Sequence, residues 1–270
     1  ELPPKFANLP PVHPEGENKT GWAGADGLAE DVRRYGEWMR DEAAERIGHL
    51  YPKALLADGS EANVVAWIWA QTVTCPNPGC RATMPLVRSF WLCKKRGKEA
   101  WARPIVDASE VRFEVAQGPA GPEVSGTVDR SGAKCLACGE AVKLEYLRSE
   151  AKSGRMGKQL MAIAAEGKRR RVYLAPSSAH VEAAAVKRPL SAPSSKLPEK
   201  ALGFRVQAYG MTTHADLFTN RQLCALTTFS DLLGDVKEHV LADAQDAGFV
   251  AEQAVAYSNA NSDYDFDVWV

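Results

Sequence analysis

The sequence has no long hydrophobic run. Among its 270 residues, Lys, Arg, Asp or Glu interrupts every apolar stretch before the roughly 18 residues that a membrane span needs. The first residues, ELPPKF, have neither the charged-then-apolar order nor the cleavage site of a secretory signal. They also lack an initiator Met, which predicts that the chain is a fragment of a longer polypeptide. We therefore expect no membrane partner.

Cysteine is also scarce. The six cysteines are too few for a disulfide scaffold in a chain of this length, and four of them form two close pairs. This usage predicts a reducing compartment, the cytoplasm.

Several catalytic motifs are missing as well. The sequence has no G-x-G-x-x-G after a strand, no G-x-x-x-x-G-K-[ST], no G-x-S-x-G and no H-E-x-x-H. The segment Asn8-Leu9-Pro10-Pro11-Val12 does not match the Asn/Asp-Pro-Pro-Tyr motif of amino methyltransferases, in which the Asn or Asp directly precedes the prolines. No catalytic residue is predicted.

What the sequence does contain is an average globular composition, 45% hydrophobic and 25% charged, with room for one large domain or two ordinary ones. The net charge of −1 conceals a basic middle: residues 81–103 hold seven bases and one acid, and residues 141–171 hold nine bases and three acids. Such a middle can present a positive face to a polyanion, although charge runs are also common on solvated faces of unrelated elements. The candidates for nucleic-acid binding are Arg81, Lys94, Lys95, Arg96, Lys168, Arg169, Arg170 and Arg171.

Three helices are predicted. Apolar residues at steps of three and four between residues 28 and 50 indicate a helix that begins at Asp26 and ends before Pro52. Thr219 and Gln222 form a capping box that predicts the start of a second long helix. The pattern KQLMAIAAE at Lys158–Glu166 indicates a short helix.

Strands are expected between these helices. Val64–Thr74 (VVAWIWAQTVT) is β-branched and aromatic and is apolar at both odd and even positions, which is typical of a strand buried on both faces. Shorter strands are expected at Val87–Lys94, Glu110–Ala116, Glu123–Val128, Val142–Leu147 and Gly203–Gly210.

The strongest motif is a set of four cysteines. Cys75 and Cys80 lie in CPNPGC directly after the predicted buried strand, and Cys135 and Cys138 lie in CLACG. Thiolates on two tight turns can occupy the corners of a tetrahedron about 2.3 Å from a zinc ion. Four protein ligands leave no open coordination position, so we expect structural zinc. Spacing alone does not distinguish zinc from iron, and a redox pair or small buried residues are alternative roles for these cysteines.

The surroundings of the four cysteines fit this prediction. Gly79 and Gly139 permit the tight turns that would aim backbone amides at the sulfurs. The long separation between the pairs implies an insertion at residues 81–134 with strands of its own. Cys93 and Cys224 lie in apolar runs and are assigned to core packing.

These features define an α+β fold: a zinc ribbon with short antiparallel strands, flanked by long helices. The predicted segments are an N-terminal loop and helix (1–63), a β-rich insert with a basic segment (64–186), a Pro- and Ser-rich linker (187–202), and a strand, helix and acidic tail (203–270).

One His-carboxylate pair remains. His214 and Asp216 in YGMTTHADLFTNRQ are close enough to act in acid/base chemistry, but no nucleophile is identifiable beside them. We expect them to cap or precede the last helix.

Four stretches together resemble a known family: ELPPKFANLPPVHPE, AWIWAQTVTCPNPGC, CLACG and GFRVQAYGMTTHADLFTNRQL. They are similar to the central region of bacterial and archaeal adenine-specific DNA methylases that carry an inserted zinc ribbon. The resemblance covers roughly residues 1–245 and weakens over the acidic end. It implies that the four cysteines are metal ligands. It also implies that the S-adenosylmethionine motif and the Pro-Pro-Tyr motif belong to the parent protein, outside this chain.

Two functions follow as hypotheses. The first is a DNA-docking or target-recognition region, inactive alone, in which basic residues near the cysteines neutralise phosphates and Trp91 or Trp101 stacks on an extruded base. Its partners would be DNA and the remainder of the methylase chain. The alternative is a zinc-ribbon scaffold that binds other subunits of a modification or defence system.

Overall fold

The computed structural model describes residues 6–12, 21–199 and 205–249, and the chain divides into two compact units. Unit 1 comprises Glu1–His49, Arg188–Ala192 and Arg221–Val270, and unit 2 comprises Leu50–Lys187 and Pro193–Asn220. The acidic tail from residue 250 and most of ELPPKFANLPPVHPE lie outside the described residues. No described helix combines the length and the apolar composition that crossing a bilayer requires.

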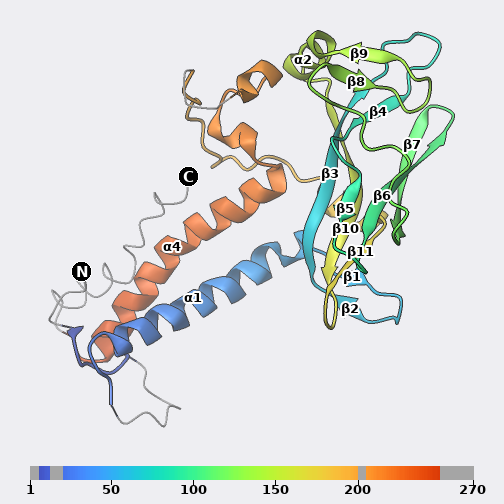
Figure 1. Ribbon diagram of the computed structural model, residues 1–270. Helices are drawn as coiled ribbons and strands as arrows, with labels where there is room; N and C mark the ends of the chain where they lie inside the picture. The colour runs from blue at the N-terminus through green and yellow to red at the C-terminus, as the bar shows by residue number, and fades with distance from the viewer. Residues whose placement is uncertain (1–5, 13–20, 200–204, 250–270) are drawn as a thin grey trace. The chain divides into compact units, whose positions relative to one another are not determined.

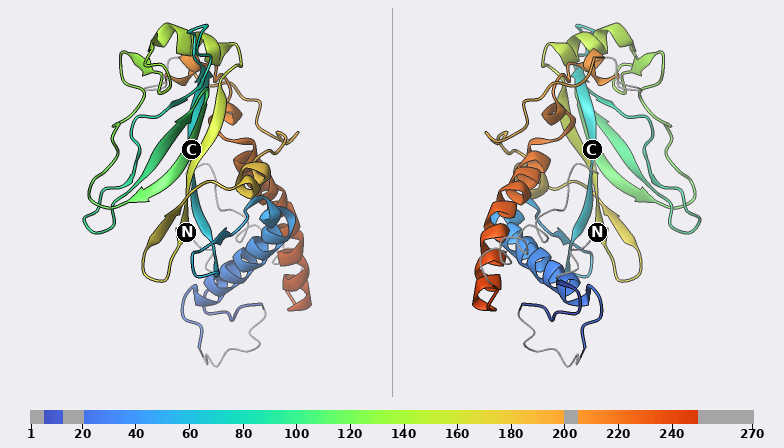
Figure 2. Two further views of the ribbon diagram at one scale, coloured as in Figure 1. Left: turned by 90° about the vertical axis from the view of Figure 1, so that its right-hand side faces the viewer. Right: turned by 90° about the vertical axis from the view of Figure 1, so that its left-hand side faces the viewer.

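The described part of unit 1 is helical. Helix α1 (Asp26–Ile47) lies antiparallel beside α4 (Asn220–Asp246), as Figures 1 and 2 show from different sides. Three side-chain pairs join the two helices: Arg46–Asp235 at 3.0 Å, Tyr35–Asp243 at 2.9 Å, and the rings of Trp38 and His239, which are tilted by 46° with centroids 4.5 Å apart. The two long helices are confirmed, and a short 3-10 turn, η2 (Gly48–Leu50), follows α1 before Pro52 as expected.

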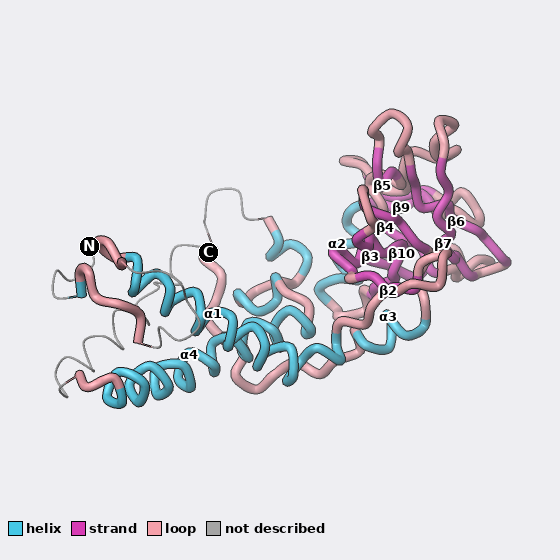
Figure 3. Tube along the Cα trace, turned by 90° about the horizontal axis from the view of Figure 1, so that it is seen from below, coloured by secondary structure: helices cyan, strands magenta, loops and turns pink. Residues whose placement is uncertain are grey.

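Unit 2 contains all the described strands, which gather together in Figure 3. Every pairing is antiparallel, and the sheet orders are β11-β10-β3-β4, β5-β6-β7, β1-β2 and β8-β9. The strands are β1 (Ala54–Leu55), β2 (Glu61–Ala62), β3 (Val64–Thr74), β4 (Thr83–Leu86), β5 (Trp91–Cys93), β6 (Ala100–Asp107), β7 (Glu110–Gln117), β8 (Gly132–Lys134), β9 (Ala141–Lys143), β10 (Gly157–Glu166) and β11 (Arg171–Leu174).

Strand β3 defines the long axis of unit 2. It runs over the 11 residues predicted for it, which corresponds to roughly 33 Å of extended chain. One end leads to Cys75, with β8, β9 and helix α2 (Leu144–Lys152) nearby; β1, β2 and the turn between β10 and β11 lie at the other end (Figure 1). Buried Phe90 and Phe113 of the β5–β7 region pack against Ala70 and Met161 of the larger sheet.

The predicted helix at Lys158–Glu166 is wrong. These residues form β10, which pairs with β3 on one side and with β11 on the other. The helix-forming residues Lys, Gln, Leu, Met and Ala mislead here because every residue from Leu160 to Ala165 is buried. A continuous buried run of this length fits a central strand that is covered on both faces, and tertiary pairing overrides the local preference.

Other strand predictions are partly wrong. Glu110–Ala116 is confirmed as β7, but Val87–Lys94 shortens to β5, and Val142–Leu147 divides between β9 and the start of α2. Glu123–Val128 forms no strand, and only Val128 makes an isolated bridge, with Ala133. The described part of Gly203–Gly210 is a 3-10 turn, η3 (Val206–Tyr209), which Gly210 ends at φ 79°.

Strand β6 was not predicted. It contains Pro104, which normally argues against a central strand because proline has no backbone N–H to donate. Strand β5 pairs with β6 only as far as Trp101, so Pro104 lies where β6 has a single neighbour, β7. The proline is therefore tolerated.

Glycine-to-alanine substitutions at two positions test how closely the β8–β9 hairpin is packed. A Cβ at Gly132 would lie 2.2 Å from the carbonyl oxygen of Val142, so Gly132→Ala should lower the free energy of unfolding by about 2 kcal/mol or more. The matched change Gly36→Ala meets no atom within 4 Å in the middle of α1 and should raise that free energy by up to about 1 kcal/mol. Denaturant unfolding followed by circular dichroism measures both, and effects of the same sign would contradict the packing described.

Candidate metal centre

The four predicted cysteines lie in the turns of two antiparallel hairpins. Cys75 and Cys80 lie in the connection between β3 and β4, and Cys135 and Cys138 lie in the connection between β8 and β9. We call these the first and the second cysteine hairpin. The inserted segment between them carries the three-stranded sheet β5-β6-β7, as the long separation predicted.

The geometry of the four sulfurs fits a single tetrahedral metal ion. All four Sγ atoms lie within 4.8 Å of one another. Cys75 and Cys138 approach to 3.7 Å, and Cys80 and Cys135 to 3.9 Å. A tetrahedron with metal–sulfur bonds of about 2.3 Å has edges of about 3.8 Å, whereas a disulfide would need about 2.05 Å. Among the described residues this is the one cluster of potential ligands of its kind.

Backbone amides point at the sulfurs, as a thiolate site requires. The N–H groups of Asn77, Ala82 and Glu140 donate to the sulfurs two residues before them, those of Cys75, Cys80 and Cys138. Hydrogen bonds of this kind stabilise the negatively charged form of each sulfur. Together they favour metal-bound thiolates over neutral side chains that merely pack.

The two hairpins share a backbone pattern. The first cysteine of each pair donates its N–H across the turn, Cys75 to Ala82 at 2.8 Å and Cys135 to Glu140 at 2.9 Å. The residue after the second cysteine has a positive φ in both turns, 54° at Arg81 and 77° at Gly139. The prediction for Gly139 is therefore right. At the first turn the left-handed residue is Arg81 rather than Gly79.

The hairpins rest on a small core. Cys75 and Cys135 are buried together with Val73, Met84 and Leu147, the last of which comes from α2. The hydroxyl of Tyr146, also in α2, donates to the carbonyl of Thr74 at 2.8 Å. Helix α2 thus fastens one hairpin to the other independently of any metal.

Burial changes the acidity of the ligands. It raises the pKa of the Cys75 thiol to about 12, while the N–H of Glu140 lowers the pKa of Cys138. A raised pKa means that the metal-free chain holds Cys75 protonated at neutral pH. A metal ion must displace that proton in order to bind.

The remaining cysteines lie outside this cluster. Cys93 and Cys224 are half-buried and are not part of the four-sulfur group. No ligand or nucleophile role is assigned to either.

The predicted basic residues separate into two places. Arg81 lies in the first cysteine hairpin, but Lys94, Lys95 and Arg96 lie in the β5–β6 turn, away from the cysteines to which they are near in sequence. Residues 97–100 of that turn line a hollow of about 380 Å³ together with residues 170–173 of the β10–β11 hairpin. The structure thus brings Lys94–Arg96 to the same end of unit 2 as Lys168–Arg171.

We call these two turns the basic turns. Lys98 and Arg170 line both the first hollow and a second one of about 660 Å³. Sequence analysis missed Lys98, although it belongs to the same run, KKRGK. In these turns Lys168 makes an ion pair, with Asp58 at 3.8 Å, and the structure records none for the other bases.

The predicted stacking role of Trp91 and Trp101 is not supported. Trp101 is only 8% exposed and packs edge-on against Trp91, with ring centroids 5.8 Å apart. A Cβ at Gly121 would come within 2.5 Å of the Trp91 ring, so backbone covers that ring. The two side chains belong to the packing of the inserted sheet.

His214 and Asp216 have local partners. The carboxylate of Asp216 accepts the backbone N–H groups of Thr212 and Thr213, at 2.9 and 2.8 Å, and caps the 3-10 turn η4 (His214–Leu217). The Nδ1 atom of His214 lies 3.0 Å from the hydroxyl of Ser195. Capping, the expected role, is confirmed for Asp216, but the turn that it caps is η4 rather than the last helix.

Comparisons with protein-family models, with curated proteins and with solved structures gave no match for this chain. The assignment to adenine methylases therefore stays a prediction from the sequence resemblance.

The metal centre can be tested with one cysteine inside the cluster and one outside it. The chain should bind one metal ion, and cobalt(II) should give the intense visible spectrum of a tetrahedral thiolate site. Cys138→Ser should weaken metal binding on the order of 100-fold or more, because it removes a direct ligand. Cys93→Ser is the control and should leave both the spectrum and the affinity unchanged. Equal effects of the two substitutions would contradict the four-sulfur site.

Metal affinity should rise with pH. Every ligand thiol that is protonated in the metal-free chain, Cys75 above all, releases its proton on binding, so the apparent affinity should increase about tenfold per pH unit for each such thiol. Acidification should correspondingly release the metal. Competition with a chelator at several pH values measures the slope, and a slope of zero would show that thiols are not the ligands.

Proposed function

We propose that the chain is a DNA-docking region of an adenine-specific DNA methylase, with a zinc ribbon as its framework. Two hairpins that contribute two cysteines each, with amides aimed at the sulfurs, are the arrangement expected of a zinc ribbon. The choice of methylase comes from the sequence resemblance. The chemistry proposed for this chain is binding alone, since the motifs for S-adenosylmethionine and for catalysis belong to the parent protein in that family.

The proposed metal is zinc, and its role is structural. Four thiolates in a tetrahedron suit zinc, which has no geometric preference of its own and undergoes no redox chemistry in a reducing compartment. With all four positions filled by protein, the ion has no place for a substrate or water. Elemental analysis of the purified chain distinguishes zinc from iron.

The observation that carries the docking proposal is the meeting of the basic turns. Lys98 of the β5–β6 turn and Arg170 of the β10–β11 turn, about 70 residues apart in the chain, line two adjacent hollows at one end of unit 2. Three further bases of the β10–β11 hairpin and two acids complete the charged lining: Lys168, Arg169, Arg171, Asp58 and Glu99. The side chains of the bases are exposed, and one of these bases alone has a recorded ion pair, so they are available to phosphates. Neutralising phosphates releases condensed counterions, which is the main source of non-specific affinity for DNA.

The metal and the basic turns have separate tasks in this proposal. They lie at opposite ends of β3, roughly 33 Å apart by strand length, so the metal does not contact DNA at the basic turns. It holds the far ends of β3 and β4 together and thereby fixes the sheet that carries the β10–β11 turn.

The scaffolding alternative receives less support. A protein-binding ribbon would be expected to expose aromatic side chains near its cysteines. Tyr146 of α2, whose hydroxyl bonds to Thr74 beside Cys75, is half-buried, and Trp67 and Trp69 lie in the half of β3 that is farther from the cysteines.

Neutralising the basic turns tests the docking proposal. Lys98→Ala with Arg170→Ala should weaken binding to a DNA duplex about tenfold at about 0.1 M salt and reduce the slope of log affinity against log salt by about 2. The control, Lys152→Ala with Lys158→Ala, removes the same charge from two exposed side chains outside the basic turns and should have a smaller effect. Binding titrations at several salt concentrations measure both pairs.

Three results would count against the proposal: no binding of duplex by the native chain, binding that does not respond to salt, or equal effects of the two variant pairs. Capture of other subunits that is lost when exposed residues of the cysteine hairpins are changed, with DNA affinity intact, would favour the scaffolding alternative.

A further inference from the structure

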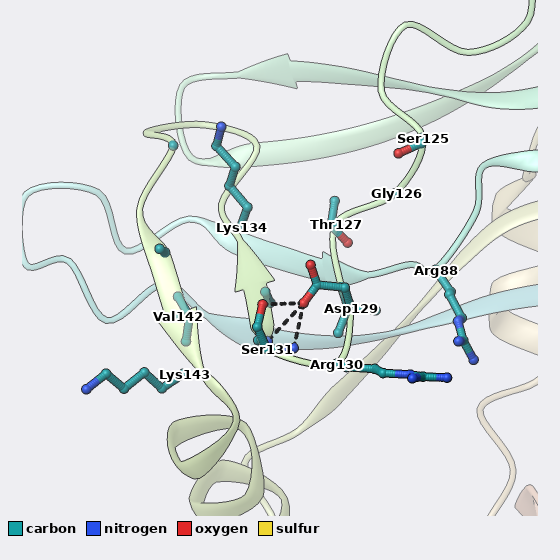
Figure 4. A pocket seen from close by; sticks show the side chains of 15 residues that line it. Arg88, Ser125, Gly126, Thr127, Asp129, Arg130, Ser131, Lys134, Val142 and Lys143 are labelled. Carbon is teal, nitrogen blue, oxygen red and sulfur yellow. Dashed lines mark hydrogen bonds between the residues drawn. The ribbon is translucent and has the colours of Figure 1, made fainter.

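A third hollow lies beside the cysteine hairpins. It measures about 870 Å³ and is lined by Arg88, residues 125–134, Gly139 and residues 141–143. We call it the cysteine groove, because strands β8 and β9 of the second cysteine hairpin form much of its wall (Figure 4). None of the eight residues predicted to bind nucleic acid lines it.

The groove is positively charged. Four bases line it, Arg88, Arg130, Lys134 and Lys143, all of them exposed and none with a recorded ion pair. Its one acid, Asp129, is occupied within its own loop: its Oδ1 accepts the N–H and the hydroxyl of Ser131, at 2.7 and 2.5 Å, and the N–H of Gly132, at 3.1 Å. The dashed lines in Figure 4 mark these bonds. The Asp129 carboxylate has no recorded ion pair with these bases, and four bases against one acid leave the lining with a net positive charge.

Small residues make up much of the lining. Five of the lining residues are glycine or alanine: Gly126, Gly132, Ala133, Gly139 and Ala141. A Cβ at Gly126 would come within 2.5 Å of the carbonyl oxygen of Arg88, so backbone packs directly on backbone at this point.

Thr127 joins the groove lining to β4 and to the chain between β4 and β5. Its hydroxyl donates to the carbonyl of Pro85 at 2.5 Å and accepts the N–H of Val87 at 2.8 Å. The wall that bears Arg130 is thus tied to the strand connection that bears Arg88.

The distribution of charge favours a polymer over a single anion. In Figure 4, Arg88 and Arg130 extend toward one side of the groove, Lys143 extends toward the opposite side, and Lys134 rises from another edge. The four charges are spread around the rim and do not converge on one point. Spaced phosphates of a nucleic-acid backbone match such a rim better than one phosphate ion does.

The lining also distinguishes duplex from single strand. No aromatic residue lines the groove. Proteins that bind single strands typically stack the bases on aromatic side chains, which contribute about 1–3 kcal/mol per base. A duplex keeps its bases stacked on one another and offers only its phosphates, which is what this groove can bind.

We infer that the cysteine groove is a second docking site for the phosphate backbone of duplex DNA. The inference rests on the proposed function and adds to it a contact separate from the basic turns. Lys134 and Gly139 directly adjoin Cys135 and Cys138, so the metal ion would hold this rim in place.

The test compares three double variants of the full chain by titration with a fully paired duplex and with a single strand of equal length. Arg88→Ala with Arg130→Ala should weaken duplex binding about tenfold at about 0.1 M salt and lower the salt slope by about 2, with a smaller loss for the single strand. Lys98→Ala with Arg170→Ala reports on the basic turns, and Lys152→Ala with Lys158→Ala is the control of equal charge.

Because all of these side chains are exposed, the substitutions should leave folding unchanged. Metal content and thermal unfolding test this, and both should equal those of the native chain for every variant. Removing the metal from the native chain should lower duplex affinity toward that of the Arg88/Arg130 variant.

The outcomes separate this inference from the proposed function. If the Arg88/Arg130 variant binds duplex like the charge control while the Lys98/Arg170 variant is weakened, the groove is not a docking site and the proposed function stands. If the native chain binds no duplex, the proposed function fails and the inference fails with it. An equal loss for single strand and duplex would overturn the assignment to duplex.

Discussion

The convergence of four sulfur atoms from two separated hairpins is the constraint on which the rest of unit 2 depends. Strands β8 and β9 have three residues each, and an isolated two-stranded sheet of that size is at most marginally stable. Its position is set by the cysteine cluster and by the packing of α2. The cost of closing a long loop grows only slowly with its length, so the inserted segment 81–134 can carry a whole sheet without preventing the cysteines from meeting.

The parts of this arrangement that the sequence predicts are those whose chemistry is local. Each cysteine pair lies within one turn, so its spacing is visible in the chain, and sulfur has few roles that require two such pairs. Helix α1 and strand β3 are predicted correctly because the hydrophobic pattern of each segment favours the same structure that its tertiary contacts stabilise. The left-handed residue at Arg81 is different, since nothing about arginine indicates a positive φ. In the structure the N–H groups of Cys80 and Arg81 both donate to the carbonyl of Asn77, which closes the turn in which Arg81 takes this conformation.

The failures have a common cause in pairing over long distances along the chain. The Ala-rich sequence of β10 has a high intrinsic helix propensity. It nevertheless forms a strand, because β3 and β11 pair with it on its two sides. The basic residues show the same limitation. Lys94–Arg96 lie close to Cys80 in sequence, yet β5 and β6 carry their turn to the opposite end of the unit, where it meets a turn some 70 residues further on. A charge map drawn along the chain therefore groups Lys94–Arg96 with Cys80, whereas the fold places them at the same end of unit 2 as the β10–β11 turn.

The cysteine groove illustrates what such a map omits. Arg88 and Arg130 are isolated in sequence, and neither belongs to a run of bases, yet the contacts of Gly126 and Thr127 with the backbone near Arg88 make them neighbours in one lining. The length of β3, roughly 33 Å, is close to one turn of B-DNA, about 34 Å, so in the proposed complex a duplex lying along β3 would follow the strand for about one turn. In the proposed complex the metal would contribute to affinity without touching the nucleic acid, because it would hold in place the second cysteine hairpin, which carries Lys134 and Lys143 of the groove.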